Sequence, residues 1–319
     1  MTAADTGRRP GHVAASGPPA GPRRPRSAPR RAHARFAFRR AWLLRTITWA
    51  YLAWSLLPIL VAILFSFNAG KSEAVLQGLS MRWYITDPEN SVLHNAQLRQ
   101  AVVQTLRLGA LTTITTVPLG ATLAIGIDRW RGRVSSTACF VIILSFVIPE
   151  LLLAVAIYFV LTQLYTFIRL GTPAEVLGLV VWNLSWPAII VRARLATIGK
   201  SYEEAAADLG ASPFQAVRRV LLPLLLPAVF ASTVLVFAGT VDDFVIVNQL
   251  SSSAATQPMS VLIYGQSHSG LGGPALNALA TLMLVFSVLA ALIGLAGYRW
   301  LTRGERGSGR EALQTVAGM

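Results

Sequence analysis

Six long apolar stretches alternate with short polar segments along this chain. A bilayer core of roughly 30 Å needs about 20 consecutive apolar residues in an α-helix to cross it. Each of the six stretches reaches that length. They cover about residues 46–67, 102–127, 136–162, 176–195, 225–250 and 275–298. The pattern therefore predicts an all-α membrane protein with six transmembrane helices.

Proline lies within five of the six predicted spans. Helices in lipid tolerate proline where neighbouring helices satisfy the freed backbone groups, so these residues favour a packed bundle over isolated anchors. The positions are Pro58, Pro118, Pro149, Pro187 and Pro227. The fourth span has the weakest pattern, because Asn183 and Ser185 also interrupt it.

Charge is sparse and unevenly placed. Charged residues make up 13% of the 319 positions, whereas a soluble domain carries about 25%. The net charge of +14 is spread over the terminal segments and short loops rather than one basic domain, so the chain is not expected to bind nucleic acid. The four histidines have no metal-ligand spacing, and no metal or other cofactor is expected on this chain.

The distribution of Lys and Arg predicts the orientation. Cytoplasmic segments of membrane proteins carry an excess of these residues. With both termini in the cytoplasm, 23 of the 28 Lys and Arg residues lie in cytoplasmic segments and five do not. The extracytoplasmic loops then cover about residues 68–101, 163–175 and 251–274. The sequence therefore predicts a multi-pass membrane protein with cytoplasmic N- and C-termini.

Two terminal segments flank the predicted six-span domain, which covers residues 41–300. Residues 1–40 are rich in Arg, Pro, Ala and Gly and lack apolar periodicity, so we expect a disordered basic cytoplasmic tail. A basic stretch before an apolar one also occurs in signal peptides, but the apolar stretch that follows Arg45 is too long for one. Residues 301–319 form the predicted cytoplasmic C-terminal tail.

The loop SYEEAAADLGASPFQAVRRVLLP covers residues 201–223 on the predicted cytoplasmic side. Ser201 followed by Glu204 predicts a capping box at the start of a short helix. Gly210 is expected to end that helix in the left-handed conformation. Ser212, which precedes a proline, predicts the start of a second helix. We therefore expect two short helices joined at a sharp glycine turn.

Such a loop either docks onto a cytoplasmic partner or is an ordinary connection with a capping glutamate, and helix signals alone do not separate the two. Its residues resemble the signature loop of permease subunits in type I ABC importers, which reads E-A-A, three residues, Gly, nine residues, Ile, one residue, Leu-Pro. The matching positions are Glu204, Ala205, Ala206, Gly210, Leu222 and Pro223, with Val220 in place of isoleucine.

This resemblance implies a MetI-like permease fold in which residues 201–223 form the ATPase-coupling loop. In that family the loop sits in a cleft of the ATPase subunit, so Glu204 and Gly210 would make or shape that contact, with Ala205 and Ala206 packing closely. The implied partners are a dimer of ABC ATPase subunits, a second and different permease subunit, an extracytoplasmic substrate-binding protein, and the lipid bilayer of a bacterial cytoplasmic membrane.

Three further motifs extend the resemblance over most of residues 100–300. They are Pro149–Glu150, Asp242–Asp243 and Asn277–Thr281. Together they resemble the second permease subunit of spermidine/putrescine importers, which implies a polyamine substrate. Permeases for ferric iron and for aminophosphonates share much of the same framework, so ferric iron, phosphonate or another solute is the alternative.

Glu150, Asp242 and Asp243 lie inside predicted spans, where a charged side chain costs roughly 2.5–3.5 kcal/mol. Such residues usually face a water-filled path or a partner, so they are candidate substrate-path residues that attract a cation. Adjacent helical residues point about 100° apart, and the two aspartates are therefore not expected to face the path together. Internal pairing, for example with Arg107, or helix capping at a kink is the alternative.

ATP is not expected to bind this chain. The sequence GKS at Gly70–Ser72 resembles the end of a phosphate-binding loop, but Phe65 stands where that pattern requires glycine. ATP and Mg²⁺ would bind the partner ATPase, and this chain would be a transport subunit rather than an enzyme. A proton-coupled carrier with the three acids as relay groups is an alternative of another class, although it needs no ATPase-docking loop.

Overall fold

The computed structural model describes residues 33–72, 74–130, 132–269 and 273–317, with side chains between residues 42 and 299. The chain divides into two compact units, which meet in sequence at Leu56 and Leu57. All regular elements in the described ranges are helical. In chain order they are α1 (His33–Ser66), η1 (Arg82–Thr86), α2 (Ala96–Arg129), α3 (Arg133–Ser145), α4 (Glu150–Phe159), η2 (Val160–Leu164), α5 (Thr172–Asn183), α6 (Ser185–Ile198), α7 (Ser201–Asp208), α8 (Pro213–Ala216), η3 (Val217–Leu221), α9 (Leu222–Asp242), α10 (Val245–Leu250), α11 (Met259–His268) and α12 (Pro274–Ala317).

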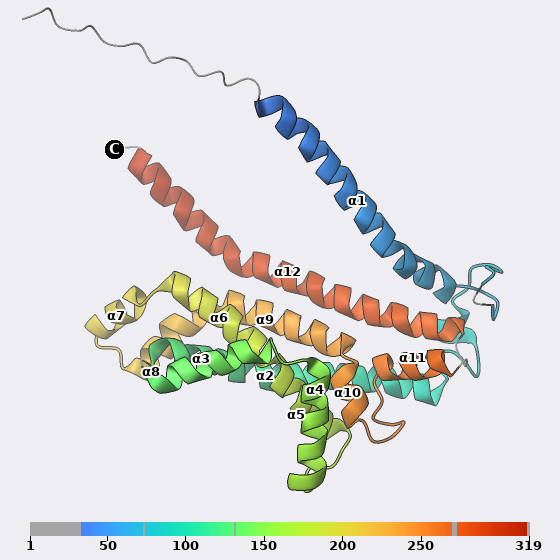
Figure 1. Cartoon of the computed structure of the whole chain (residues 1–319). Coiled ribbons are helices and arrows are strands. Elements are labelled where there is room, and N and C mark those ends of the chain that lie inside the picture. Colours follow the sequence, from blue (N-terminus) through green and yellow to red (C-terminus); the bar gives the residue numbers. More distant parts are fainter. Residues whose placement is uncertain (1–32, 73, 131, 270–272, 318–319) are drawn as a thin grey trace, which may run out of the picture. The chain divides into compact units, whose positions relative to one another are not determined.

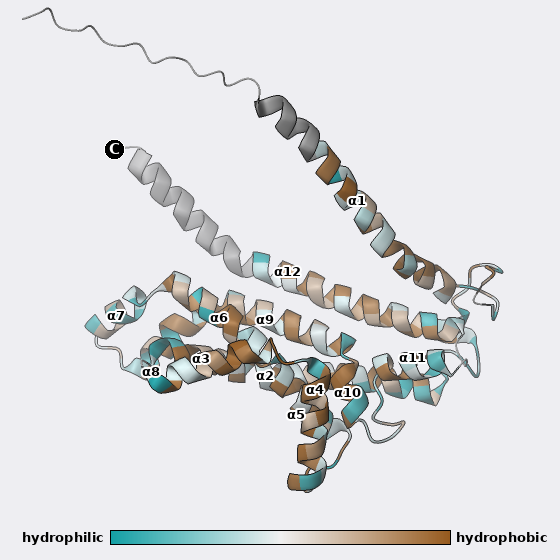
Figure 2. Cartoon of the chain, viewed as in Figure 1, coloured by the Kyte–Doolittle hydropathy of each residue, from teal (hydrophilic) through white to brown (hydrophobic). Residues whose placement is uncertain are grey.

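Five segments in the described ranges are long and apolar enough to cross a membrane. They are Trp42–Ser66, Ala96–Arg129, Thr172–Ile198, Pro213–Asp242 and Pro274–Arg299. A sixth span requires α3 and α4–η2 to count together. Figure 2 shows apolar residues along these helices and polar residues in α7. The predicted all-α membrane fold is therefore confirmed.

The third predicted span is not one straight helix. Its two parts, Arg133–Ser145 and Glu150–Leu164, are bent by 109°, and α4 turns away from α3 in Figure 1. The break ends at Pro149, which precedes the first residue of α4. Proline has no backbone N–H, and its ring clashes with the preceding turn of a helix. Pro149 therefore interrupts the span, although the apolar pattern predicts a continuous helix.

The fourth predicted span is confirmed in spite of its polar residues. It runs from Thr172 to Ile198, with a local turn at Leu184 between α5 and α6. The Asn183 side chain donates a hydrogen bond to the Leu179 carbonyl at 2.9 Å. The amide is therefore satisfied within its own helix and does not end the span.

Helix α2 occupies the centre of the second unit. It packs against α5, α6 and α9, and it also contacts α3 and α11. Its buried face contains many small residues at spacings of three and four: Ala101, Thr105, Gly109, Thr112, Thr116, Gly120 and Ala124. Small residues let neighbouring helix backbones approach closely, which is how helices associate in lipid.

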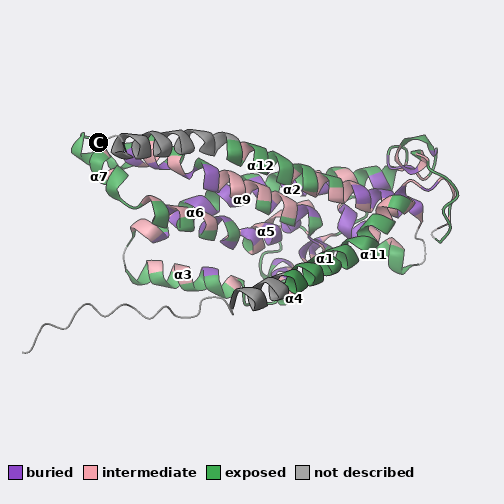
Figure 3. Cartoon of the chain, turned by 90° about the horizontal axis from the view of Figure 1, so that it is seen from above, coloured by how far each residue is buried: buried purple, intermediate pink, exposed green. Residues whose placement is uncertain are grey.

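Two glycines mark the closest approaches to α2. A methyl group at Gly109 would lie 2.8 Å from the Phe237 ring of α9, and one at Gly120 would overlap the Pro187 ring of α6. The buried residues concentrate along this centre, while the outward faces of the helices stay exposed (Figure 3). The exposed faces are rich in large apolar side chains, as expected for surfaces that contact lipid.

The segment between α1 and α2 is folded rather than an open loop. The Trp83 indole N–H donates to the Asn68 carbonyl at 2.6 Å, and the Arg82 guanidinium pairs with Asp87 at 2.8 Å. The Asn90 backbone N–H and the Arg82 guanidinium hold the pKa of Asp87 below its ordinary value of 3.8, against the opposing effect of burial. The ionised Asp87 carboxylate therefore stabilises the fold at pH values above 3.8. This stabilisation is lost as the pH falls through the lowered pKa.

The expected loop 251–274 also contains an element that the sequence analysis missed. Helix α11 packs against α12 and α2, and its Met259 and Leu262 belong to a buried cluster with Trp83. The Met259 N–H donates to the Thr105 hydroxyl at 2.8 Å. This stretch is only ten residues long, too short to register as a span.

Both predicted terminal tails contain helix in their described parts. Helix α1 begins at His33, inside the segment 1–40 that was expected to be disordered, and the rest of that prediction lies outside the described residues. At the other end, the backbone of α12 continues as a helix to Ala317, through most of residues 301–319.

We predict that Gly120→Ala lowers the thermal unfolding midpoint of the detergent-purified protein. The added methyl group overlaps Pro187, and overpacking a filled interior costs about 1–3 kcal/mol. Gly126→Ala is the matched control in the same helix, because a methyl group there has no neighbour within 4 Å. The control is expected to be neutral or slightly stabilising, and equal effects of the two substitutions would contradict the close α2–α6 contact.

Candidate functional site

Helix α7 projects from one end of the second unit, opposite the end that carries α11 (Figure 1). None of its residues is buried. Glu204 and Ala205 are exposed, and Ala206 is half-buried. The predicted capping box of Ser201 and Glu204 is wrong, because Lys200 is the N-cap and no side chain caps the helix. The Glu204 side chain is therefore not used to cap its own helix.

Gly210 ends α7 as the sequence predicts. Its φ is +84°, in the left-handed region that favours glycine. The Ala211 N–H donates to the Ala206 carbonyl at 2.9 Å, and the Gly210 N–H donates to the Ala207 carbonyl at 2.8 Å. This pair of bonds is the Schellman motif, which satisfies carbonyl groups left open at a helix end.

The second helix of this loop begins at its predicted cap. The Ser212 hydroxyl accepts from the Gln215 N–H at 3.4 Å, and the Gln215 side chain accepts from the Ser212 N–H at 3.0 Å. The helix is not separate from the membrane span, however, because it continues through η3 into α9. Leu222 and Pro223 are consequently the first two residues of α9.

The α7 turn exposes large apolar side chains that the sequence analysis did not single out as contact residues. Leu209 is 90% exposed and Phe214 is 71% exposed, on either side of Gly210. The available sequence signal is an apolar residue directly before the glycine that ends a polar helix. Exposed apolar residues gathered at a projecting turn are typical of a protein interaction site.

A second group of candidate residues lies where α9 ends. Asp243 follows the last residue of α9 and is only 8% exposed. Its Oδ1 accepts from the Ile246 N–H at 3.2 Å and from the Val247 N–H at 3.4 Å. The Asp243 carboxylate thereby caps the first turn of α10 from the position before the N-cap residue Phe244. The Asp243 carbonyl accepts a 2.6 Å hydrogen bond from the Ser260 hydroxyl.

Glu150 lies at the break between α3 and α4. It is the first residue of α4, and its carboxyl lies near the Asp243 carboxyl. Two carboxylates in contact repel when both are ionised. The pair is therefore suited to attract a cationic group.

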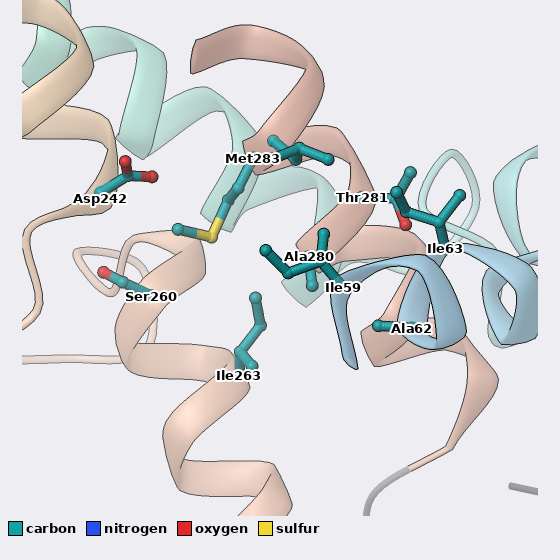
Figure 4. Close-up of a pocket in the computed structure, with 10 residues that line it drawn as sticks. Ile59, Ala62, Ile63, Asp242, Ser260, Ile263, Ala280, Thr281 and Met283 are labelled. Carbon is teal, nitrogen blue, oxygen red and sulfur yellow. The ribbon is translucent and has the colours of Figure 1, made fainter. Parts of the chain in front are cut away.

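Asp242, unlike the buried Asp243, faces a cavity. It is exposed, and its Oδ1 accepts from the Ser287 hydroxyl at 3.3 Å. Figure 4 shows it at one edge of a cavity of about 410 Å³, opposite the aliphatic side chains of α1, α11 and α12. The other lining residues are Ile59, Ala62, Ile63, Ser260, Ile263, Ala280, Thr281, Met283 and Leu284. The cavity thus combines one carboxylate with an almost wholly apolar wall.

Internal ion pairing does not account for the two aspartates. Within the described part of the chain, Arg107 is exposed and forms no ion pair with either of them. The same part of the chain contains no cluster of three or more His, Cys, Asp and Glu side chains that could hold a metal ion.

One buried acid was missed by the sequence analysis. Glu175 lies in the first turn of α5 and is fully buried. Its Oε2 accepts from the Gln104 amide at 2.7 Å, and Gln104 also donates to the Thr172 hydroxyl at 2.8 Å. These bonds join α2 to α5. The hydropathy pattern predicts Glu175 in the loop 163–175, and only Gln104 inside the apolar stretch of α2 points to a polar partner.

Comparison with known proteins gives the same fold. A bacterial ABC transporter for the acidic polysaccharide alginate has a chain that matches with a TM-score of 0.66 at 17% identity, over 85% of this chain and 100% of that one. The MetNI methionine ABC transporter, in an inward-facing conformation, matches with a TM-score of 0.52 at 22% identity, over 64% of this chain and 94% of that one. The MetI-like permease fold is therefore confirmed.

Two sequence relatives come from Escherichia coli strain K12. The putrescine transport system permease protein PotI is 29% identical over 78% of this chain and 87% of its own length. The spermidine/putrescine transport system permease protein PotC is 29% identical over 82% of this chain and 95% of its own length.

The model of one protein family matches residues 116–307, which is more than half of the chain. The matched range includes α7, the break before α4 and both aspartates at the end of α9. The chain therefore belongs to the binding-protein-dependent transport system inner membrane components.

Proposed function

We propose that this chain is a permease subunit of an ATP-driven importer and forms part of the path for a polyamine. The observation that carries the proposal is Asp242 at the edge of an apolar cavity, in a chain whose relatives include putrescine and spermidine/putrescine permeases. The chain itself is a transport subunit, and ATP with Mg²⁺ binds a partner.

The chemistry of the cavity suits an amine. A polyamine consists of ammonium groups separated by methylene chains, so it needs both charge compensation and apolar contact. A carboxylate stabilises an ammonium group most where water is partly excluded. The Asp242 carboxylate supplies the charge, and the wall formed by α11 and α12 supplies the apolar contact.

The alternative solutes fit less well. A phosphonate carries negative charge and would be repelled by Asp242 and by the Glu150–Asp243 pair. Ferric iron prefers several oxygen ligands, whereas the described residues offer two neighbouring carboxyl groups and no larger cluster. A proton-coupled carrier has no use for the exposed α7 turn.

We place the ATPase subunits at α7. Glu204, Ala205, Ala206 and Gly210 form the turn that enters the cleft of the ATPase, and Leu209 with Phe214 supplies apolar contact. This assignment makes the α7 end cytoplasmic, with both chain termini on that side. A binding protein then docks at the α11 end. A second, different permease subunit completes the path, which opens alternately to the two sides as the ATPases close and separate.

The substrate prediction concerns the assembled importer. In vesicles that hold both permeases and both ATPases, the binding protein loaded with putrescine or spermidine is expected to raise ATP hydrolysis several-fold. Loading with ferric iron or a phosphonate is the control and is expected to leave the basal rate unchanged. Stimulation by one of the controls alone would remove the polyamine assignment and keep the importer.

The two aspartates are predicted to differ in their effects. Asp242→Asn removes the charge from the cavity and is expected to lower polyamine uptake about tenfold, the effect of losing roughly 1.4 kcal/mol of interaction, with an unchanged unfolding midpoint. Asp243→Ala removes the cap of α10 and is expected to lower stability by about 1 kcal/mol. Uptake and thermal unfolding are measured on both variants, and full uptake by Asp242→Asn would exclude this residue from the path.

Docking is tested by Glu204→Ala. We expect the ATPase subunit to co-purify several-fold less well with this variant, because an exposed charged contact is lost, while membrane insertion stays normal. Glu89→Ala removes the same charge from an exposed position between α1 and α2 and serves as the control. Equal recovery of ATPase with both variants would refute a role of Glu204 in docking.

A further inference from the structure

An ion pair joins the end of α2 to α7. Arg129 is the last residue of α2, and its Nε lies 3.1 Å from Oε1 and 3.0 Å from Oε2 of Glu203. Its Nη2 also contacts Glu203 and lies 3.5 Å from the Gly199 carbonyl. The guanidinium is further held by Asp128. The two partners are 74 residues apart in sequence, so this contact is tertiary.

The Arg129–Glu203 pair links α7 to α2, while α7 also packs against α8 and η3. Helix α7 has no buried residue. It is bounded by Gly199 and Gly210, which have φ of +71° and +84° and open space around them. Left-handed glycines permit backbone rotations that other residues resist. A short helix between two such positions takes its orientation from its contacts, which are the ion pair to α2 and the packing against α8 and η3.

The pair is protected enough to act as a firm attachment. Both side chains are only 20% exposed. Salt screens a sheltered ion pair less than an exposed one. Arginine also presents its N–H groups in a rigid plane that matches a carboxylate, which fixes direction as well as distance.

Arg129 belongs to α2, the central helix of the second unit. Helix α2 packs against α5, α6 and α9. A displacement of α7 that pulls on Arg129 therefore reaches the helices that carry Glu175 and the aspartates. Glu204 lies about 100° further around α7 than Glu203, so one glutamate is directed to α2 while the next stays exposed.

We propose that the Arg129–Glu203 ion pair transmits the movement of the docked ATPase from α7 to α2 and so couples ATP hydrolysis to opening of the path. This inference rests on the proposed function, in which the ATPase binds at α7. Arg129 and Glu203 are positioning residues: neither touches ATP or the transported solute.

The test uses the complete importer in vesicles, with both permeases, the ATPases and the polyamine-loaded binding protein. Solute transported per ATP hydrolysed is measured for Arg129→Glu, Glu203→Arg and the double charge exchange. Each single variant is expected to assemble and hydrolyse ATP while the ratio falls at least tenfold. The double exchange rebuilds the pair in reverse and is expected to recover most of the ratio. Arg133→Glu, an exposed arginine at the start of α3, is the matched control and keeps the normal ratio.

Two results would overturn the inference. One is a normal ratio in both single variants. The other is an equal loss of hydrolysis and transport that the double exchange does not recover, because it indicates that the pair only supports the fold. If a charge reversal prevents assembly, Arg129→Gln and Glu203→Gln replace it, since both remove the charge and leave a polar side chain, and Glu203→Gln also keeps the side-chain length. Failure of the unaltered importer to hydrolyse ATP would instead count against the proposed function itself.

Discussion

The close packing of α2 against α5, α6 and α9 is the constraint on which the rest of the bundle depends. Lipid is as apolar as a leucine side chain, so burial of apolar surface does not drive helices together inside a membrane. Contact depends instead on small residues that permit close approach. Gly109 lies against Phe237 and Gly120 against Pro187, and the hydrogen bond from Gln104 to Glu175 adds a polar link between α2 and α5.

Breaks in the surrounding helices bring acidic residues together. The end of α9 places Asp243 at the cap of α10, and the bend at Pro149 places Glu150 beside it. A continuous helix in either span would carry one of these carboxyl groups away from the other. Helix breaks within a membrane require other groups to satisfy the freed backbone, and the Asp243 side chain does this for Ile246 and Val247.

The two ends of the second unit differ in how their short helices are buried. At the α11 end, Trp83, Met259 and Leu262 form a shared core, and the short helices there are held by buried contacts. At the α7 end, an exposed helix lies between two left-handed glycines, packs against α8 and η3, and is joined to α2 by the Arg129–Glu203 pair. The first end is held by buried apolar contacts, whereas the second consists of an exposed helix between two glycines.

The sequence by itself determined the helical membrane class, the positions of most spans, the glycine that ends α7 and the cap at Ser212. Each of these depends on local hydrophobicity or on neighbours within one helical turn, which a sequence shows directly. It did not determine the bend of the third span, helix α11, the failed cap at Ser201 or the burial of Glu175. It also could not pair Arg129 with Glu203 or Glu150 with Asp243. Only the tertiary structure decided these, because they depend on which distant segments α2 and the broken helices bring within hydrogen-bonding distance.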